Sequence, residues 1–245
     1  MRALSAIELL DLWEQAAGES LAERALRLLA AACPERGREA IAQLPMGRRD
    51  AELLELRRGT FGDEVVGTTT CPQCDERLET AVAAASLLDA AAGESTESGF
   101  VLAVDGYEVI GRLPGSVDLC ALSPDDTPER AREQLLRWCI PTACQDGQPI
   151  APTALPSVVL AAAEQRMAEL DPGADLRLAL SCPSCGHQWE AVFDIASFLW
   201  AEIDAWAERT VRDVDRLASA YGWSETDILR LSPARRECYL ELTGA

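Results

Sequence analysis

Two cysteine-containing turns carry the clearest chemistry in this sequence. One is Cys71-Pro72-Gln73-Cys74 and the other is Cys182-Pro183-Ser184-Cys185. A Cys-x-x-Cys turn lets two thiolates meet one ion, and two such turns supply the four sulfur ligands that fill a tetrahedral zinc shell. We therefore predict one structural zinc ion per chain. Its predicted ligands are Cys71, Cys74, Cys182 and Cys185.

The same turns admit other interpretations. They could lack metal, or each could pair with a turn of another chain, because Cys74 and Cys182 lie far apart in the sequence. A long insertion adds little closure entropy, so a single site within one chain is favoured. A thioredoxin-type redox site is disfavoured because that motif opens a helix, whereas both turns here lie between predicted strands.

Catalysis is not predicted. A catalytic zinc keeps an open position beside three protein ligands, whereas four cysteines complete the shell. His187 is the only histidine, so a histidine-based triad has no second member, and we interpret His187 as a polar residue beside the second turn. The sequence has no P-loop, G-x-G-x-x-G, G-x-S-x-G or H-E-x-x-H motif. The other five cysteines are predicted to be small buried hydrophobic residues: Cys33, Cys120, Cys139, Cys144 and Cys238.

A predicted strand precedes each turn, and the surrounding residues repeat. Residues 65–70 are rich in β-branched side chains and lead into the first turn, and residues 176–181 lead into the second turn. With the offset that aligns Cys71 with Cys182, the following residues match: Glu79 with Glu190, Ala85 with Ala196, Ser86 with Ser197, and Leu88 with Leu199. We predict two ββ knuckle units that pair pseudo-symmetrically into a split zinc ribbon, each followed by the start of a helix. A chance likeness around two common turns is the alternative.

The regions outside the knuckles are predicted to be mainly helical. Ser5 to Glu8 has capping-box spacing, and Gly59 is predicted to end a helix that begins at Gly47. After the second knuckle an apolar stripe marks a long helix, and covering the protein's own core is favoured over covering a partner. The stripe consists of Leu199, Ile203, Trp206, Thr210, Val214 and Leu217.

The segment between the knuckles is predicted to be an insertion. It contains a predicted linker over residues 91–98, a hairpin around Asp105-Gly106 and a helix from Pro156 to Leu170. The overall prediction is a predominantly helical α+β fold. Its predicted regions are an N-terminal helical region (1–60), a first knuckle unit (61–90), an inserted hairpin and helical arm (91–172), a second knuckle unit that completes the zinc ribbon (173–198), and C-terminal helices (199–245).

Charge and hydropathy narrow the class of partner. The chain has 22 basic and 41 acidic residues, a formal net charge of -19 and a pI near 4.4, so its field repels phosphate backbones and anionic lipid surfaces. We therefore expect neither nucleic acid nor a membrane as partner. The first ten residues lack the basic and apolar regions of a signal peptide, and no run approaches about 18 apolar residues, so we expect a cytoplasmic protein.

Several short segments, taken in their order along the chain, carry a resemblance to a known group of proteins. They are residues 30–34, 44–50, 61–62 with the first knuckle, 111–119, 221–224 and 231–236. In this order the chain resembles the zinc-ribbon-containing baseplate proteins of contractile injection systems, which are related to the baseplate hub assembly chaperone family of T-even phage tails. The resemblance implies a component or assembly chaperone of the hub or wedge of a phage tail-like particle, with other baseplate or hub proteins as partners. It brings no catalytic residues.

Two other classes of function compete with this one. The first is a zinc-ribbon nucleic-acid-binding or transcription-associated adaptor, which the net charge of -19 opposes. The second is a metalloenzyme, which would need an open position on the metal. The sequence leaves open whether the chain forms a homo-oligomer.

Overall fold

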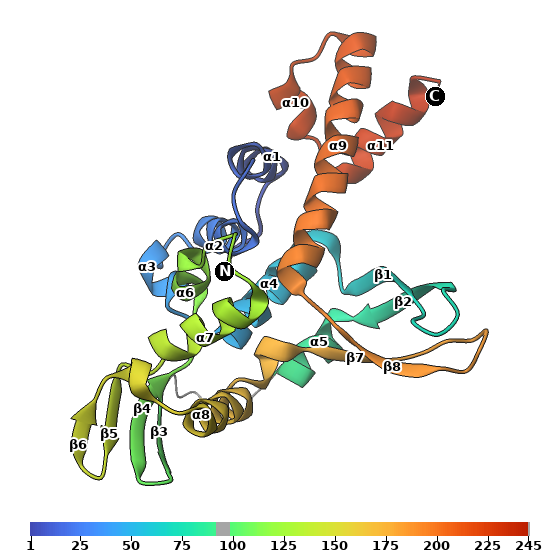
Figure 1. Cartoon of the computed structure of the whole chain (residues 1–245). Helices are drawn as coiled ribbons and strands as arrows, with labels where there is room; N and C mark the ends of the chain where they lie inside the picture. Colours follow the sequence, from blue (N-terminus) through green and yellow to red (C-terminus); the bar gives the residue numbers. More distant parts are fainter. Residues whose placement is uncertain (92–98, 245) are drawn as a thin grey trace.

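Helices and small antiparallel sheets make up the fold, as predicted. The structure is a computed structural model that describes residues 1–91 and 99–244. Residues 92–98 of the predicted linker lie outside the described residues. The helices are α1 (Ala6–Gln15), α2 (Leu21–Ala32), α3 (Arg38–Ala42), α4 (Met46–Phe61), α5 (Ala84–Ala91), α6 (Ser116–Ala121), α7 (Pro128–Trp138), α8 (Ser157–Leu170), α9 (Ile195–Tyr221), α10 (Glu225–Leu229) and α11 (Pro233–Leu242), with 3-10 turns η1 (Pro152–Ala154) and η2 (Pro172–Asp175). The strands are β1 (Glu64–Thr70), β2 (Arg77–Ala83), β3 (Gly99–Val104), β4 (Tyr107–Arg112), β5 (Thr142–Gln145), β6 (Gln148–Ile150), β7 (Arg177–Ser181) and β8 (Gln188–Val192). Figure 1 shows a helical body from which the hairpins β1–β2 and β7–β8 project together.

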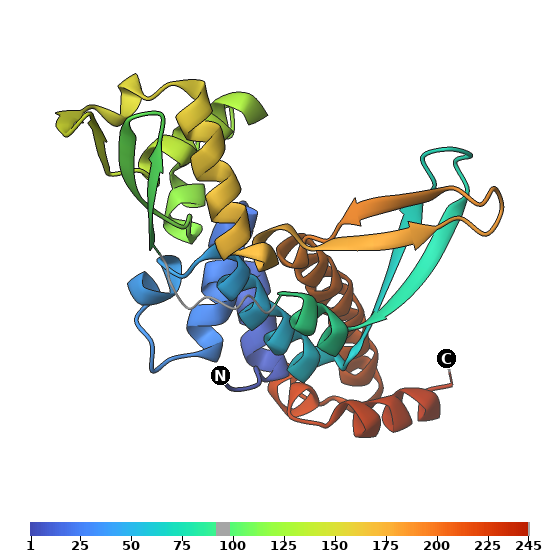
Figure 2. The ribbon, with the colours of Figure 1, turned by 90° about the horizontal axis from the view of Figure 1, so that it is seen from below.

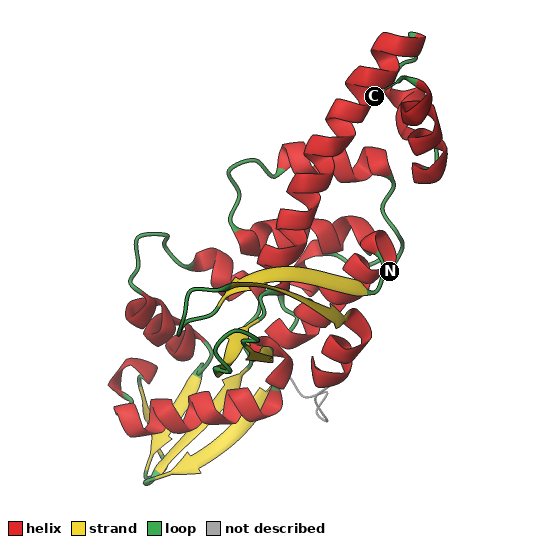
Figure 3. Cartoon of the chain, turned by 90° about the vertical axis from the view of Figure 1, so that its right-hand side faces the viewer, coloured by secondary structure: helices red, strands yellow, loops and turns green. Residues whose placement is uncertain are grey.

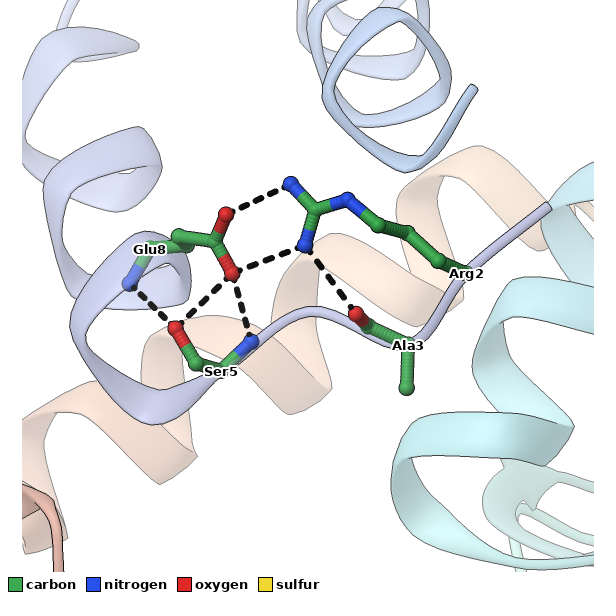
Figure 4. Close-up of polar contacts among 4 residues, drawn as sticks. All are labelled: Arg2, Ala3, Ser5 and Glu8. Carbon is green, nitrogen blue, oxygen red and sulfur yellow. Dashed lines mark hydrogen bonds and ion pairs between the residues drawn. The ribbon is translucent and has the colours of Figure 1, made fainter. Parts of the chain in front are cut away.

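Serine caps begin the first two helices, and the capping box predicted at Ser5 is confirmed. Ser5 Oγ accepts a hydrogen bond from the Glu8 backbone N–H (3.3 Å), and the Glu8 carboxylate accepts one from the Ser5 N–H (2.9 Å) (Figure 4). Arg2 donates to both oxygens of the same carboxylate, at 2.5 and 3.0 Å. The Arg2 guanidinium and the Ser5 donors lower the pKa of Glu8 to about 2. Ser20 and Glu23 form a second capping box at α2.

The main core lies between α2, α4 and the first half of α9. Its largest fully buried side chains are Leu29, Ile41, Leu53, Leu54, Ile195, Leu199 and Ile203. Burial of each such side chain stabilises the fold by about 1.5–3 kcal/mol. Two polar links fix α9 on this core, because Trp13 Nε1 donates to Asp204 (2.7 Å) and the buried Arg57 guanidinium binds Glu202 (2.7 and 2.9 Å).

Helix α4 ends later than predicted. The prediction placed its end at Gly59, but the helix continues to Phe61, and Gly62 follows it with φ +96°. A glycine inside a helix is tolerated at a cost of about 1 kcal/mol, whereas a positive φ is strained for other residues. The residue that needed to be glycine is therefore Gly62, and its position decides where the helix stops.

Helix α9 covers the protein's own core with its apolar stripe, which confirms the favoured interpretation. Leu199 and Ile203 belong to the main core, whereas Leu217 lies in a small separate core with Ile228 of α10 and Leu240 of α11. Thr210 is buried between these two groups along the helix. No helix among the described residues is both long enough and apolar enough to cross a membrane.

The predicted hairpin around Asp105-Gly106 is confirmed and belongs to a four-stranded sheet of order β3-β4-β5-β6. Helix α8 packs on this sheet to form the second core (Figure 3). Both turn residues have positive φ, as a two-residue hairpin connection requires. The same dipeptide at Asp146-Gly147 connects β5 to β6, a hairpin that was not predicted although the sequence contains its turn signal.

A junction joins the second core to the helical body, and we define it by three segments: the start of α4, the loop before α6, and η2. Gly47 donates its N–H to Asp171 Oδ2 (2.9 Å), and Met46 donates to the Pro114 carbonyl (3.1 Å). A Cβ placed on Gly47 would lie 2.8 Å from backbone atoms of η2. Real Cβ atoms do not approach backbone so closely, so the junction requires glycine here.

Candidate metal centre

The two hairpins that carry the Cys-x-x-Cys turns share one strand register. Thr70 pairs with Arg77 in the first hairpin, and Ser181 pairs with Gln188 in the second, so the constant offset between the two copies is preserved. The helices that follow also start at equivalent positions, since α5 begins at Ala84 and α9 at Ile195. The repeat noticed in the sequence therefore corresponds to a repeated local structure.

The two turns also share their backbone hydrogen bonds. Cys71 donates its N–H to the Glu76 carbonyl (2.9 Å), and Cys182 donates to the His187 carbonyl (2.8 Å). In each turn the residue after the second cysteine has a positive φ, which is +57° at Asp75 and +74° at Gly186. These bonds fold each loop so that both of its cysteines point to one side.

The four cysteines meet at the far ends of the hairpins, which lie side by side in Figures 1 and 2. Cys71 Sγ lies 3.7 Å from Cys185 Sγ, and Cys74 Sγ lies 3.6 Å from Cys182 Sγ. All four sulfurs lie within 4.8 Å of one another, and we call this group the four-cysteine cluster. Both turns belong to the same chain, so a bound ion would not need a second copy.

The spacing of the sulfurs fits a tetrahedral metal site. With metal–sulfur bonds of about 2.3 Å, the edges of a regular tetrahedron of sulfurs measure about 3.8 Å. A disulfide would instead require sulfurs about 2.05 Å apart. The observed sulfur pairs at 3.6 and 3.7 Å match the tetrahedral edge. They are too far apart for disulfide bonds in this conformation. The cluster can therefore hold a thiophilic metal ion.

Burial and charge differ among the four sulfurs. Cys71 and Cys182 are buried, whereas Cys74 and Cys185 are exposed. Backbone N–H groups of Cys185 and Ser184 hydrogen-bond the Cys182 sulfur and lower the pKa of its thiol to about 7. At Cys74 the Glu76 N–H lowers the pKa, but the neighbouring thiols outweigh it and raise it to about 12. Four adjacent thiols thus resist joint ionisation, and a divalent cation would supply the compensating charge.

The hairpins have an apolar interior behind the cluster. Val82 and Leu178, one from each hairpin, line a cavity of about 170 Å³ together with Phe198 of α9. The hairpins thus approach each other at the four-cysteine cluster and face a common cavity nearer the body.

Other candidate residues lie away from the cluster or beside it. His187 stacks on Trp189, with ring centroids 5.9 Å apart, and it does not belong to the cluster of potential ligands. The prediction of buried cysteines holds for Cys33 and Cys139. It is wrong for two others, which lie on exposed sides of α6 and α11: Cys120 and Cys238. Cys144 is half-buried on β5.

Comparison with known proteins identifies the family. The chain matches the family described as T4 bacteriophage base plate protein over residues 8–200, a range that contains both knuckles and excludes α10, α11 and most of α9. Searches of curated proteins and of solved structures found no match. Because the match spans more than half of the chain, this protein belongs to the T4 bacteriophage base plate protein family.

Proposed function

We propose that this protein is a non-enzymatic component or assembly chaperone of the hub or wedge in the baseplate of a phage tail-like contractile injection system. The observation that carries the proposal is the family match over residues 8–200. Its partners are other baseplate or hub proteins, and it is cytoplasmic until it joins a particle. The acidic surface favours partners that present basic residues.

In this proposal one structural zinc ion per chain, bound by the four-cysteine cluster, completes a split zinc ribbon. The ion supplies four metal–sulfur bonds that connect the two hairpin tips. The support is the tetrahedral spacing of the sulfurs and the N–H groups that stabilise the Cys182 thiolate. Five regions with the predicted borders, 1–60, 61–90, 91–172, 173–198 and 199–245, remain part of the proposal.

The connection has a mechanical purpose in this proposal. Each hairpin alone is a two-stranded ribbon, and such ribbons are marginally stable in water. Joining them at the tips gives one stiffer projection that a neighbouring baseplate protein can contact. The long insertion between the two turns does not prevent this, since the closure cost rises only logarithmically with its length.

The experiment is affinity purification of the tagged chain from its native cells, with mass spectrometry of bound proteins and metal analysis of the same sample. We expect tube, sheath or hub proteins and one zinc per chain. Cys182→Ser should lose the zinc, and Cys144→Ser, which removes a thiol outside the cluster, should retain it.

The outcomes separate the parts of the proposal. Presence of the chain in finished particles indicates a component, and its presence only in assembly intermediates indicates a chaperone. Recovery of RNA polymerase or nucleic acid, with binding to DNA that falls steeply with salt, would favour the transcription-associated adaptor and contradict the baseplate role. Recovery of the expected partners without zinc would contradict the metal site alone.

A further inference from the structure

The two edges of the four-stranded sheet are built differently. The strand order is β3-β4-β5-β6, so β3 and β6 are the edges. Strand β6 has three residues and contains Pro149, and both features discourage pairing with a further strand. Strand β3 has six residues, Gly-Phe-Val-Leu-Ala-Val, without a charge or a proline. Of these two edges, β3 is therefore the one whose own residues include none of the charges or prolines that usually discourage strand addition.

The turn between β3 and β4 determines which backbone groups form the ladder. Asp105-Gly106 is a two-residue connection, so Val104 and Tyr107 form the hydrogen-bonded pair that closes the hairpin. Hydrogen-bonded pairs then alternate with non-hydrogen-bonded pairs along an antiparallel ladder. The N–H and C=O groups of every second residue of β3 consequently face away from β4.

Within residues 100–104 these outward groups belong to Val101 and Ala103, whereas those of Leu102 face β4. In the part of the chain that the structure describes, no backbone group of another segment forms a hydrogen bond with the N–H or C=O groups of Val101 or Ala103. The edge thus presents a donor and an acceptor at each of two positions. A further strand is the structure that pairs with such a row.

The outer face of the sheet adds an apolar surface beside this edge. The Val101 side chain is 75% exposed, and Ile110, its partner across the ladder, is 52% exposed. Phe100 and Leu102 point to the opposite face and pack in the second core with α8. The exposed pair is therefore not needed by the fold of this chain, and a partner segment that adds to β3 can cover it.

Charge identifies the kind of segment that fits. The turn and the outer face carry Asp105 and Glu108, and the one cation of this hairpin, Arg112, is already bound by Asp118 at 2.6 Å. A second copy of this chain would bring the same acids and a net charge of -19 toward the edge. An apolar segment with basic residues is the better complement.

We propose that β3 binds one extended segment of another baseplate protein by strand addition. The segment pairs with the outward groups of Val101 and Ala103, covers Val101 and Ile110 with alternate apolar side chains, and carries a basic residue where it passes Glu108. The choice of a baseplate protein as the source rests on the proposed function. The pairing itself rests on a strand without charge or proline, on the exposed Val101 and Ile110, and on the acidic residues beside them.

Residue-resolved hydrogen exchange tests this pairing in the full chain, free and within baseplate complexes purified through a tag on the chain. The N–H groups of Val101 and Ala103 should exchange fast in the free chain and at least about tenfold more slowly in the complex. The N–H of Leu102 should be protected in both states because it lies in the ladder. Unchanged exchange at Val101 and Ala103 in the complex would overturn the inference while leaving the baseplate role intact. Absence of baseplate proteins from the purified complexes would overturn the baseplate role and the partner named here.

Two variants separate backbone pairing from side-chain contact. Val101→Pro removes one outward N–H but no ladder donor, whereas Val101→Thr keeps the donor and a β-branched side chain. Recovery of baseplate proteins should fall about tenfold with Val101→Pro and stay within about threefold with Val101→Thr. Protection of Leu102 in both variants verifies that the hairpin is folded. Equal recovery by the two variants would contradict strand addition.

A photo-crosslinking amino acid at Ala103 identifies the occupant without relying on the variants. A cross-link to an extended segment of another baseplate protein, with basic residues near the cross-linked position, is the expected result. A cross-link to residue 103 of a second copy would contradict the assigned partner. A cross-link to a helix or to nucleic acid would contradict strand addition.

Discussion

Two places in this molecule bring distant segments of the chain together, and they do so by different means. At the four-cysteine cluster two loops far apart in the sequence meet through side chains, whose sulfurs lie 3.6 and 3.7 Å apart. At the junction three segments approach one another backbone to backbone, because Gly47, Gly115 and Gly173 have no side chains, and Asp171 adds one side-chain hydrogen bond to the Gly47 N–H. In the proposed zinc-bound state the first connection depends on an ion that can be removed, whereas the second depends on the polypeptide alone.

Metal removal should have the largest effect and should separate the two connections. If free zinc exceeds its dissociation constant about 1,000-fold, chelation lowers the stability of the metal-bound state by about 4 kcal/mol. The main core does not include the four cysteines, so the helical body should stay folded. Hydrogen exchange should therefore accelerate in β1, β2, β7 and β8 on addition of a chelator, while the far-UV circular dichroism of the helices is preserved. Loss of both signals together would show that the two connections are not independent.

Gly47→Ala should damage the junction and leave the cluster intact. The added Cβ would lie 2.8 Å from the backbone of Gly173 and Ala174, which cannot move without displacing η2. We expect the free energy of unfolding in urea to fall by about 3 kcal/mol, with unchanged zinc content. Gly59→Ala is the matched control on the same helix. Nothing lies within 4 Å of its added Cβ, and it should raise stability by up to about 1 kcal/mol.

Acid should affect the two connections in opposite directions. Burial raises the pKa of Asp50, near the junction, from 3.8 to about 6, in spite of its ion pair with Arg49. The stabilising contribution of the protonated Asp50 carboxyl is fully present below pH 4. It is lost as the pH rises through 6, so the free energy of unfolding declines from pH 4 to above pH 6. Zinc affinity instead rises with pH, since protons compete with the ion for the thiolates at low pH.

The measurement is urea unfolding between pH 4 and 7 in the presence of a chelator, so that zinc release does not contribute. The Asp50→Asn variant should show a flatter dependence on pH than the unmodified chain. Asp11→Asn, which changes an exposed carboxyl on α1, should keep the original slope. A slope unaffected by Asp50→Asn would show that this carboxyl does not cause the pH dependence of stability.

The smallest expected effects distinguish the two knuckles from each other. Their positive-φ residues are Asp75 at +57° and Gly186 at +74°. Asp75→Gly should relieve strain and Gly186→Ala should introduce it, each by about 1 kcal/mol, which corresponds to about a fivefold change in zinc affinity. Competition with a chromophoric chelator measures both constants. Changes of the same sign in the two variants would contradict the shared geometry.

The four-cysteine cluster and the junction also differ in how far the sequence predicts them. The cluster was predictable because ligand type and Cys-x-x-Cys spacing are local, and the capping box at Ser5 and the hairpin at Asp105-Gly106 are local as well. The junction was not predictable, since the contact of Gly47 with Gly173 joins residues far apart in the chain, and neither glycine reveals its partner.

Local signals also failed in particular ways. Two glycines lie near the end of α4, and only the backbone conformation decides that Gly62 rather than Gly59 ends it. The exposure of Cys120 depends on which face of α6 meets the body, which a single cysteine cannot indicate. In the four-cysteine cluster no sequence pattern indicated that Cys71 and Cys182 are buried while Cys74 and Cys185 are exposed.

Native mass spectrometry of the intact chain tests the metal-based connection most directly. If the site forms within one chain, we expect one zinc ion per chain whether the chain is monomeric or assembled, and no zinc in Cys71→Ser or Cys182→Ser. Cys144→Ser should keep the full zinc complement. A chain purified without chelators that carries no metal, or zinc found only in dimers that lose it on dissociation, would contradict a site formed within one chain.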